Sequence, residues 1–234
     1  LIWPLSEHPF AISNIFIIDP LYTLPLLLAF LCTLIPKIHT PRIYKINAAM
    51  LVLSSLYLCS SLILKVIINN KIDAAFAHKH IHINNYVSTP APLTTLLWRV
   101  VAMYDGQYYI SYASVFDSPE EVTINLYNTS PALLNEIKNE WGVQRLQWFT
   151  KGFYSVKEQQ NKIVLTDLRM GMECYYVFNF AVGEKTNKGV QVSNFEKLNQ
   201  RSNLSSLSKV WGRIWNPDVS LAPPYADKNC MKTP

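Results

Sequence analysis

The sequence predicts a membrane α-helical hairpin of two transmembrane helices, followed by a small α+β, β-rich soluble domain. Two observations predict the hairpin: residues 20–36 and 48–64 are apolar and carry no charge, and a short basic loop separates them. A third observation predicts the domain. From about residue 88, short segments rich in β-branched and aromatic residues alternate with turn residues.

Composition agrees with a membrane protein and gives no sign of nucleic-acid binding. Only 16% of the 234 residues are charged, whereas 50% are hydrophobic. The 21 Lys and Arg residues exceed the 16 Asp and Glu residues by five, but they are scattered singly along the chain. No basic run is dense enough to follow a phosphate backbone. The expected partner is therefore the lipid bilayer, with no nucleic acid.

Residues 1–18 form a pre-membrane segment, and residues 19–68 are predicted to hold both transmembrane helices with a basic loop at 37–47. Each apolar run is near the lower limit of about 17 residues for a membrane span. Ile17 and Ile18 lengthen the first run. The second run reaches Ile68 only if Lys65 extends its ammonium group to the lipid headgroups. The alternative is a pair of buried helices in a soluble protein.

The basic loop indicates an orientation in the membrane. Lys37, Arg42 and Lys45 lie in it without an acidic residue, so the positive-inside rule places the loop in the cytoplasm. Everything after Ile68 would then be extracytoplasmic, although Lys65 and Lys71 weigh against this orientation. Residues 69–87 are predicted to form a juxtamembrane linker.

Residues 88–183 are predicted to form the α+β domain. Its strongest local signal is Asp105-Gly106, which predicts a two-residue type I′ turn between strands at 96–104 and 107–116. Ser130 and Pro131 are typical of a helix start and predict a helix over 131–141. Further strands are predicted at 123–127, 143–149, 153–156, 162–168 and 175–182.

Residues 184–234 are predicted to form a polar tail with a short amphipathic helix at 203–215. Trp211 and Trp215 lie beside Lys209 and Arg213, a combination that suits the surface of a membrane. Docking of this helix onto its own domain is equally compatible with the pattern. The end of the chain, from Pro217, is expected to lack a fixed structure.

Few side chains suggest chemistry. His78, His80 and His82 would share one face of an extended strand, but only Asp73 lies near enough in sequence to complete a zinc site. The simpler interpretation is a solvated juxtamembrane segment.

Charged residues and cysteines have simpler interpretations still. Arg99, Asp167 and Arg169 lie among core residues and are expected to form an ion pair within the fold. Cys174 and Cys230 would pair only in an oxidising compartment.

Asp19 is the remaining candidate. Asp19-Pro20 suits the N-cap of a helix, where the carboxylate lies over the positive end of the helix dipole. The same carboxylate would also suit a metal ion held by histidines elsewhere. Local chemistry alone favours the cap.

Several blocks of sequence occur together in an order that is typical of one family. They are the string from Leu1 to Phe10, the string from Phe16 to Leu26, Thr89-Pro-Ala-Pro-Leu with Leu96-Leu-Trp-Arg-Val100, Phe149-Thr-Lys-Gly-Phe-Tyr154 and Thr166-Asp-Leu-Arg-Met-Gly171. From Leu1 to about Val182 the chain resembles the bacterial predicted membrane-bound metal-dependent hydrolases of the inner-membrane, LexA-regulated type.

The resemblance implies a multi-pass protein of the bacterial inner (plasma) membrane that uses a divalent metal ion. The family's motif His-Arg-x-x-Thr-His-Ser lies in helices that precede the block matched by Leu1, and this chain does not contain it. The chain is therefore expected to be N-terminally incomplete, with those membrane helices as partners. Asp19 is the one contributor to the metal site that the resemblance implies here; the metal's identity and the small-molecule or envelope substrate stay open.

Two functions follow. The first is the C-terminal part of an inner-membrane metal-dependent hydrolase, inactive when expressed without the preceding helices. The second is a membrane-anchored, non-catalytic binding or sensing module of the cell envelope. For the second, Tyr108, Tyr109 and Tyr112 would form a ligand-binding face; otherwise they form one half-buried face of a sheet.

Overall fold

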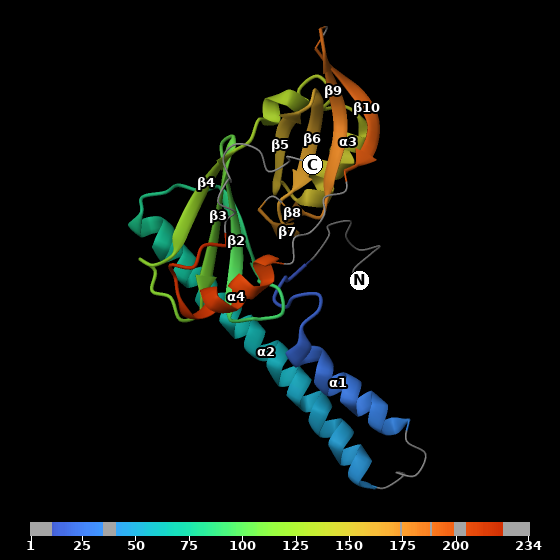
Figure 1. Ribbon diagram of the computed structural model, residues 1–234, viewed down its shortest axis with the longest axis vertical. Helices are drawn as coiled ribbons and strands as arrows, with labels where there is room; N and C mark the ends of the chain where they lie inside the picture. Colours follow the sequence, from blue (N-terminus) through green and yellow to red (C-terminus); the bar gives the residue numbers. More distant parts are fainter. Residues whose placement is uncertain (1–10, 35–40, 174, 188, 199–204, 222–234) are drawn as a thin grey trace.

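The structure is a computed structural model that describes residues 11–34, 41–173, 175–187, 189–198 and 205–221. Two helices project from one end of the molecule, and two antiparallel sheets with their covering helices make up the rest (Figure 1). We call residues 20–33 and 41–67 the helical arm and residues 85–221 the β-rich body. The long apolar helix and the β-rich body confirm the predicted fold class in part, but they do not confirm the predicted hairpin of two transmembrane helices.

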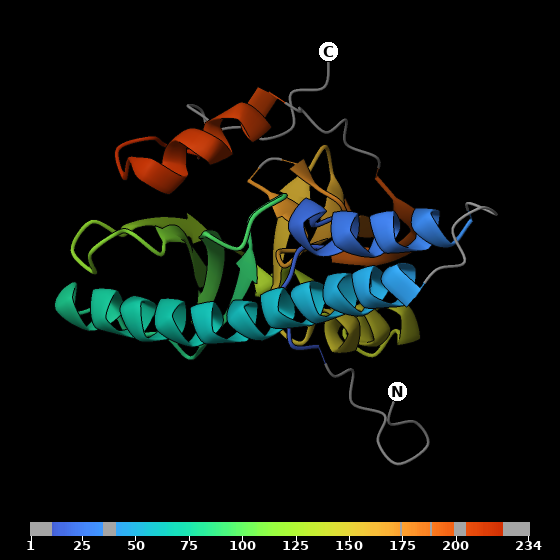
Figure 2. The ribbon, with the colours of Figure 1, turned by 90° about the horizontal axis from the view of Figure 1, so that it is seen from below.

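Helix α1 (Pro20–Thr33) and helix α2 (Pro41–His78) lie side by side in the arm (Figures 1 and 2). Among the described residues, α2 is the one helix long and apolar enough to cross a membrane. Its 38 residues correspond to roughly 57 Å at 1.5 Å per residue, well beyond a hydrocarbon thickness of about 30 Å. Helix α1 carries no charged residue but has only 14 residues.

The second part of α2 packs against the body. Ile68, Ile72, Ala75 and Phe76 recur at helical spacing and are buried against one face of the first sheet. Residues 69–78, predicted to begin a juxtamembrane linker, therefore continue the helix. They stay helical because the apolar side chains on one face of this segment pack on the first sheet.

The first sheet, sheet A, has the strand order β1-β2-β3-β4 with antiparallel neighbours. Its strands are β1 (Asn85–Pro90), β2 (Leu97–Tyr104), β3 (Gln107–Ser114) and β4 (Thr123–Asn128). Asp105 and Gly106 join β2 to β3 with φ values of 29° and 75°. Two positive φ values are those of a type I′ turn, so the predicted turn is confirmed.

The second sheet, sheet B, has the order β10-β9-β6-β5 and is also antiparallel. Its strands are β5 (Tyr154–Gln159), β6 (Lys162–Asp167), β9 (Asn179–Thr186) and β10 (Gly189–Lys197), and a small ribbon of β7 (Gly171–Met172) and β8 (Tyr175–Tyr176) lies beside them. Strand β10 occupies part of the predicted polar tail. The predicted strand at 175–182 is divided between β8 and β9.

The connection between the sheets differs from the sequence prediction. Residues 131–134 form a short 3₁₀ helix, η1 (Pro131–Leu134), and helix α3 spans Trp141–Thr150, where a strand is predicted over 143–149. The predicted helix over 131–141 and that strand are both wrong. Val143 and Leu146 are three residues apart, and both pack on sheet B. Only a helix places residues at this spacing on one face, so packing on the sheet favours a helix over a strand here. Ser130 makes no side-chain capping bond.

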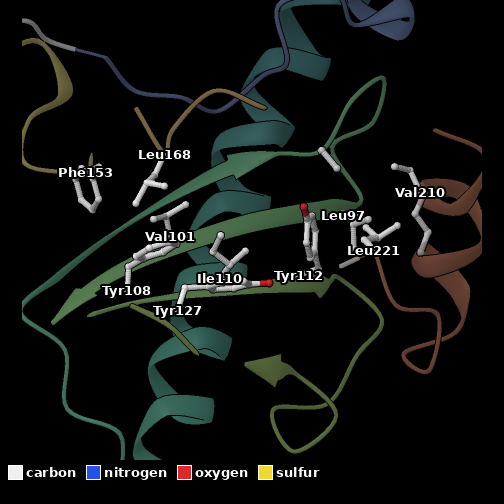
Figure 3. Packing of buried hydrophobic residues seen from close by; sticks show 12 residues of the cluster. Leu97, Val101, Tyr108, Ile110, Tyr112, Tyr127, Phe153, Leu168, Val210 and Leu221 are labelled. Carbon is white, nitrogen blue, oxygen red and sulfur yellow. The ribbon is translucent and has the colours of Figure 1, made fainter. Parts of the chain in front are cut away.

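A shared core connects the two sheets (Figure 3). On the face of sheet A opposite α2, Val101 and Ile110 pack with Phe153 and Leu168, which flank strands β5 and β6. Helix α4 (Ser205–Trp215) closes the end of this core with Val210. Sheet A therefore lies between α2 on one side and α4 on the other, as Figure 2 shows.

Candidate functional site

Asp19 lies where the arm meets the body, and it is only 1% exposed. Its Oδ1 accepts hydrogen bonds from the backbone N–H groups of Leu21 (3.0 Å) and Tyr22 (3.3 Å) at the start of α1. Its Oδ2 accepts a bond from the Tyr57 hydroxyl of α2 at 2.8 Å. The predicted N-cap is confirmed, and the same carboxylate ties α1 to α2.

The Tyr57 hydroxyl extends this connection into the body. It lies 3.1 Å from the hydroxyl of Thr95, which precedes strand β2. Because the single proton of Tyr57 is directed to Asp19, the Thr95 hydroxyl is the donor in this second bond. One chain of hydrogen bonds thus joins α1, α2 and the entry to sheet A.

Helix α2 carries a line of polar side chains on the side that it turns toward the rest of the protein. They recur every three or four residues, which places them on one face: Ser54, Tyr57, Ser61, Lys65 and Asn69. We call this the polar face of α2. The Ser54 hydroxyl donates to the carbonyl of Tyr22 (3.2 Å), and the Ser61 hydroxyl accepts from the Asn14 amide (2.7 Å).

Lys65 is the only ionisable cation of the polar face, and its ammonium group is held within the protein. Its Nζ donates to the backbone carbonyls of Ile12 (2.7 Å), Ser13 (3.0 Å) and Ser88 (2.9 Å). Three carbonyls use all three of its protons. The second predicted span reaches Ile68 only if Lys65 extends to the headgroups. In the structure its ammonium group is held by these backbone carbonyls.

The described residues do not by themselves form a metal centre. Nowhere within the described ranges do three or more His, Cys, Asp or Glu residues form a group able to hold a metal ion. Both oxygens of Asp19 already accept N–H or O–H donors. His78 ends α2 and His80 has a φ of 52°, so the three histidines do not share the face of an extended strand.

A second buried polar cluster lies between the two sheets. The Arg99 guanidinium of β2 donates to the Leu168 carbonyl (2.7 Å) and to the Tyr176 hydroxyl (3.2 Å). The Tyr112 hydroxyl donates to Glu173 at 2.8 Å. Arg99 Nε and Glu173 Oε1 are buried and find no hydrogen-bond partner within the described part of the chain.

Burial and charge shift the pKa values of this cluster. Burial alone would lower the pKa of Arg99, but Tyr176, Glu173 and Tyr112 outweigh it and hold that pKa above its ordinary value. Burial raises the pKa of Tyr108 to about 12. It also raises the pKa values of Tyr112 and Tyr176 well above the ordinary value. These tyrosines therefore stay neutral throughout the physiological range.

The predicted ion pair among Arg99, Asp167 and Arg169 is formed only in part. Asp167 and Arg169 form a two-pronged pair, with the nearest atoms 2.6 Å apart. Arg99 instead bonds to the carbonyl of the residue between them, Leu168. This partner could not be predicted from sequence, because every residue has a backbone carbonyl whatever its side chain.

The predicted ligand-binding face of tyrosines does not form. Tyr108 and Tyr112 are buried in the shared core, and Tyr108 stacks on Tyr127 with ring centroids 5.3 Å apart. Tyr109 points to the other face of sheet A, where it meets Phe76 edge-on. The alternative, one half-buried sheet face, holds only for Tyr108 and Tyr112, because Tyr109 lies on the opposite face.

Helix α4 docks through an ion pair that the sequence gives no means to find. Arg213 donates to Asp117 at 2.7 and 3.0 Å and to the Tyr112 carbonyl at 2.8 Å. Both side chains of the pair are almost fully buried. Asp117 and Arg213 are 96 residues apart, so no local pattern connects them. Of the two predicted positions for this helix, docking on the body accounts for its buried side.

Cys174 and Cys230 lie outside the described residues, and Cys32 and Cys59 are free thiols. No protein-family model, curated protein or solved structure matches the chain. The candidate site is therefore defined by geometry: a buried carboxylate, Asp19, at the point where two apolar helices join a β-rich body.

Proposed function

We propose that the chain is a membrane-anchored module whose helical arm lies in a lipid bilayer as a hairpin and whose β-rich body stands at the membrane surface. Large apolar side chains on the outer side of the arm support this proposal. They are exposed on both helices and include Leu24, Leu28, Phe30, Leu53, Leu56 and Ile63. An apolar surface of this extent is unfavourable in water and suits hydrocarbon.

The observation that carries the proposal is the contrast between the two sides of α2. Its outer side is apolar, whereas every described member of its polar face is hydrogen-bonded within the protein. Polar groups in a bilayer need internal partners because lipid offers none. The arm meets that requirement from Ser54 onward, whereas the buried Oδ1 of Asn47, two turns earlier, has no partner among the described residues.

The predicted basic loop at 37–47 is shorter in the structure, because α2 already begins at Pro41 and includes Arg42 and Lys45. The positive charges of this end of the arm support an orientation with that end in the cytoplasm and the body outside it. With the family resemblance, this makes the proposed location the bacterial inner membrane. In this arrangement Asp19 lies at the extracytoplasmic end of the arm, since the start of α1 is opposite the loop.

We further propose that this module is the C-terminal part of a metal-dependent hydrolase. One contact between the blocks that carry the family resemblance supports it, since Arg99 bonds to the carbonyl of Leu168. Asp19 also reaches Thr95, which lies between two of the blocks, through Tyr57. A divalent metal ion would take its ligands from the helices with the histidine motif, which the family resemblance places before the block matched by Leu1. This chain's own contribution is to anchor, position and cover that centre.

Anchoring and catalysis require separate tests. The expressed chain should stay in the membrane fraction after alkaline carbonate washing, and extraction into the wash would contradict the anchoring. Assayed with Zn²⁺ or Mn²⁺ on phosphoester and amide substrates, the isolated chain should give no turnover. Turnover that disappears on Asp19→Ala would show that the centre is complete without further helices.

A second candidate, a non-catalytic module that binds an envelope component, is favoured by the absence of a three-ligand group within the described ranges. The two candidates differ in what the full-length protein does. If the longer protein containing the histidine motif binds a divalent ion and hydrolyses a substrate, the enzyme is correct. If it does neither and the body alone retains an envelope ligand, the binding module is correct.

A further inference from the structure

Helix α4 and the loop that follows β3 together present three aromatic rings to solvent. Phe116, Trp211 and Trp215 are 58%, 63% and 59% exposed, and we call them the aromatic patch. Phe116 stacks on Trp215 with centroids 4.9 Å apart, and Trp211 meets Trp215 edge-on at 6.4 Å. The three rings therefore form one continuous apolar surface.

The patch is fixed in place. Beneath it, Arg213 pairs with Asp117 in a buried ion pair, and the Ser114 hydroxyl donates to the Ile214 carbonyl at 2.7 Å. Val210 and Ile214 are buried in the shared core. Because these contacts fill the inner side of α4, the helix cannot roll over to hide its tryptophans without breaking a buried ion pair.

The patch lies at the end of sheet A that faces the arm. Leu97, the first residue of β2, pairs with Ser114, the last residue of β3, and α4 packs on both strands at this end. Thr95, two residues before Leu97, contacts Tyr57 of the arm. The Asp105-Gly106 turn is at the opposite end of the same strands. Figure 1 shows α4 across the end of the sheet from which the arm projects.

Other exposed apolar residues surround this end. Ile17 and Ile18 directly precede the cap of α1, and Leu93 is in the loop between β1 and β2. Exposed apolar residues are thus found both on the arm and at the end of the body that faces the arm. Lys209, on the same helix as the two tryptophans, is exposed and adds a positive charge.

We infer that the aromatic patch is a second membrane contact, in which Phe116, Trp211 and Trp215 lie in the lipid–water interface of the bilayer that holds the arm. Tryptophan favours this region because its ring suits the acyl boundary and its N–H suits the headgroups. Lys209 would meet anionic headgroups. The inference rests on the proposed membrane anchoring. It adds the aromatic patch as a second contact with the bilayer, beside the junction between the arm and the body.

The test uses the full chain reconstituted into vesicles of phosphatidylcholine and phosphatidylglycerol, with a fraction of the lipid brominated near the headgroup end of its acyl chains. Bromine quenches tryptophan emission at short range. The chain has six tryptophans, so a Trp211→Phe, Trp215→Phe double variant is compared with Trp141→Phe, Trp148→Phe. The latter pair is on α3, which packs on sheet B through Val143 and Leu146, and its rings are 77% and 40% exposed, so it matches the exposure of the first pair.

The Trp211→Phe, Trp215→Phe variant should lose about half of the lipid quenching, whereas the α3 control should retain it. Quenching of Trp211 and Trp215 by aqueous acrylamide in place of brominated lipid would overturn the inference. So would shielding from both quenchers, which would mean that another polypeptide covers the patch. If carbonate washing releases the chain from vesicles, the anchoring proposal fails; if the chain stays but the quenching does not differ, only this inference fails.

Discussion

The two parts of helix α2 have opposite polarity. From residue 51 to residue 67 the outer side is apolar and the inner side carries Ser54, Ser61 and Lys65, all hydrogen-bonded within the protein. From residue 68 to residue 78 the arrangement is reversed, with Ile72 buried and Asp73 exposed. One helix thus has the pattern expected for lipid in its first part and for water in its second. In the proposed anchoring, the point of reversal marks the boundary between lipid and water.

The largest expected effect is the loss of packing in the second part. Ile72→Ala should lower the free energy of unfolding by about 2–5 kcal/mol, because it leaves a cavity between α2 and sheet A. Leu56→Ala, on the exposed side of the first part, should change it by less than about 0.5 kcal/mol. Denaturant titration of both variants in mild detergent measures the difference. Equal losses would mean that the two parts share one environment.

The next effect concerns insertion into the membrane. Leu56→Asp should make insertion of the arm less favourable by about 2.5–3.5 kcal/mol, since a carboxylate would face hydrocarbon. Asn70→Asp, an exposed position in the second part, should leave insertion unchanged. The fraction of each variant that resists carbonate extraction provides the measurement. An unaffected Leu56→Asp variant would contradict a lipid environment for the first part.

A smaller effect should appear at alkaline pH and should come from the body. The pKa of Tyr108 is raised by burial from its ordinary value near 10 to about 12, so the folded state favours the neutral phenol. Its contribution to stability is complete below about pH 10 and is lost as the pH rises toward 12, by about 1.4 kcal/mol per pH unit between them. Unfolding free energies at successive pH values test this. Tyr108→Phe should flatten the slope, and an unchanged slope would assign it to other groups.

The smallest effect is expected at the cap of α1. Asp19→Ala should destabilise the protein by about 1 kcal/mol because the N–H groups of Leu21 and Tyr22 lose their acceptor. Asp19→Asn keeps an acceptor oxygen and should recover most of that loss. Thermal unfolding of the two variants makes the comparison. A loss for Asn as large as that for Ala would show that the negative charge, not the acceptor oxygen of the cap, is what the site requires.

The features that could be predicted from sequence are those encoded by neighbouring residues. The apolar run of α2, the Asp19-Pro20 cap and the Asp105-Gly106 turn each depend on a few consecutive positions. Helix α3 could not be predicted, because Val143 and Leu146 suit a strand as well as a helix until sheet B is there to cover one side.

In the candidate site, too, single residues could be predicted from sequence but their distant partners could not. Asp19 stands out from its apolar surroundings, but its bond to Tyr57 spans 38 residues and has no local sign. The same holds for Lys65, whose acceptors are backbone carbonyls and thus independent of side-chain identity. Gly142 is a further case: a side chain there would overlap the ring of Phe195, a residue of β10 that the sequence pattern did not connect with α3.

Between Arg42 and His78, α2 contains neither proline nor glycine, the usual causes of a sharp bend. This straight helix is bonded to Asp19 through Tyr57 and is packed on sheet A through Ile72, so its two parts are expected to move together. When the thickness of a bilayer changes, a spanning helix adjusts by tilting. In the proposed anchoring, such a tilt of α2 would carry sheet A with it, because Ile68, Ile72 and Phe76 pack on that sheet.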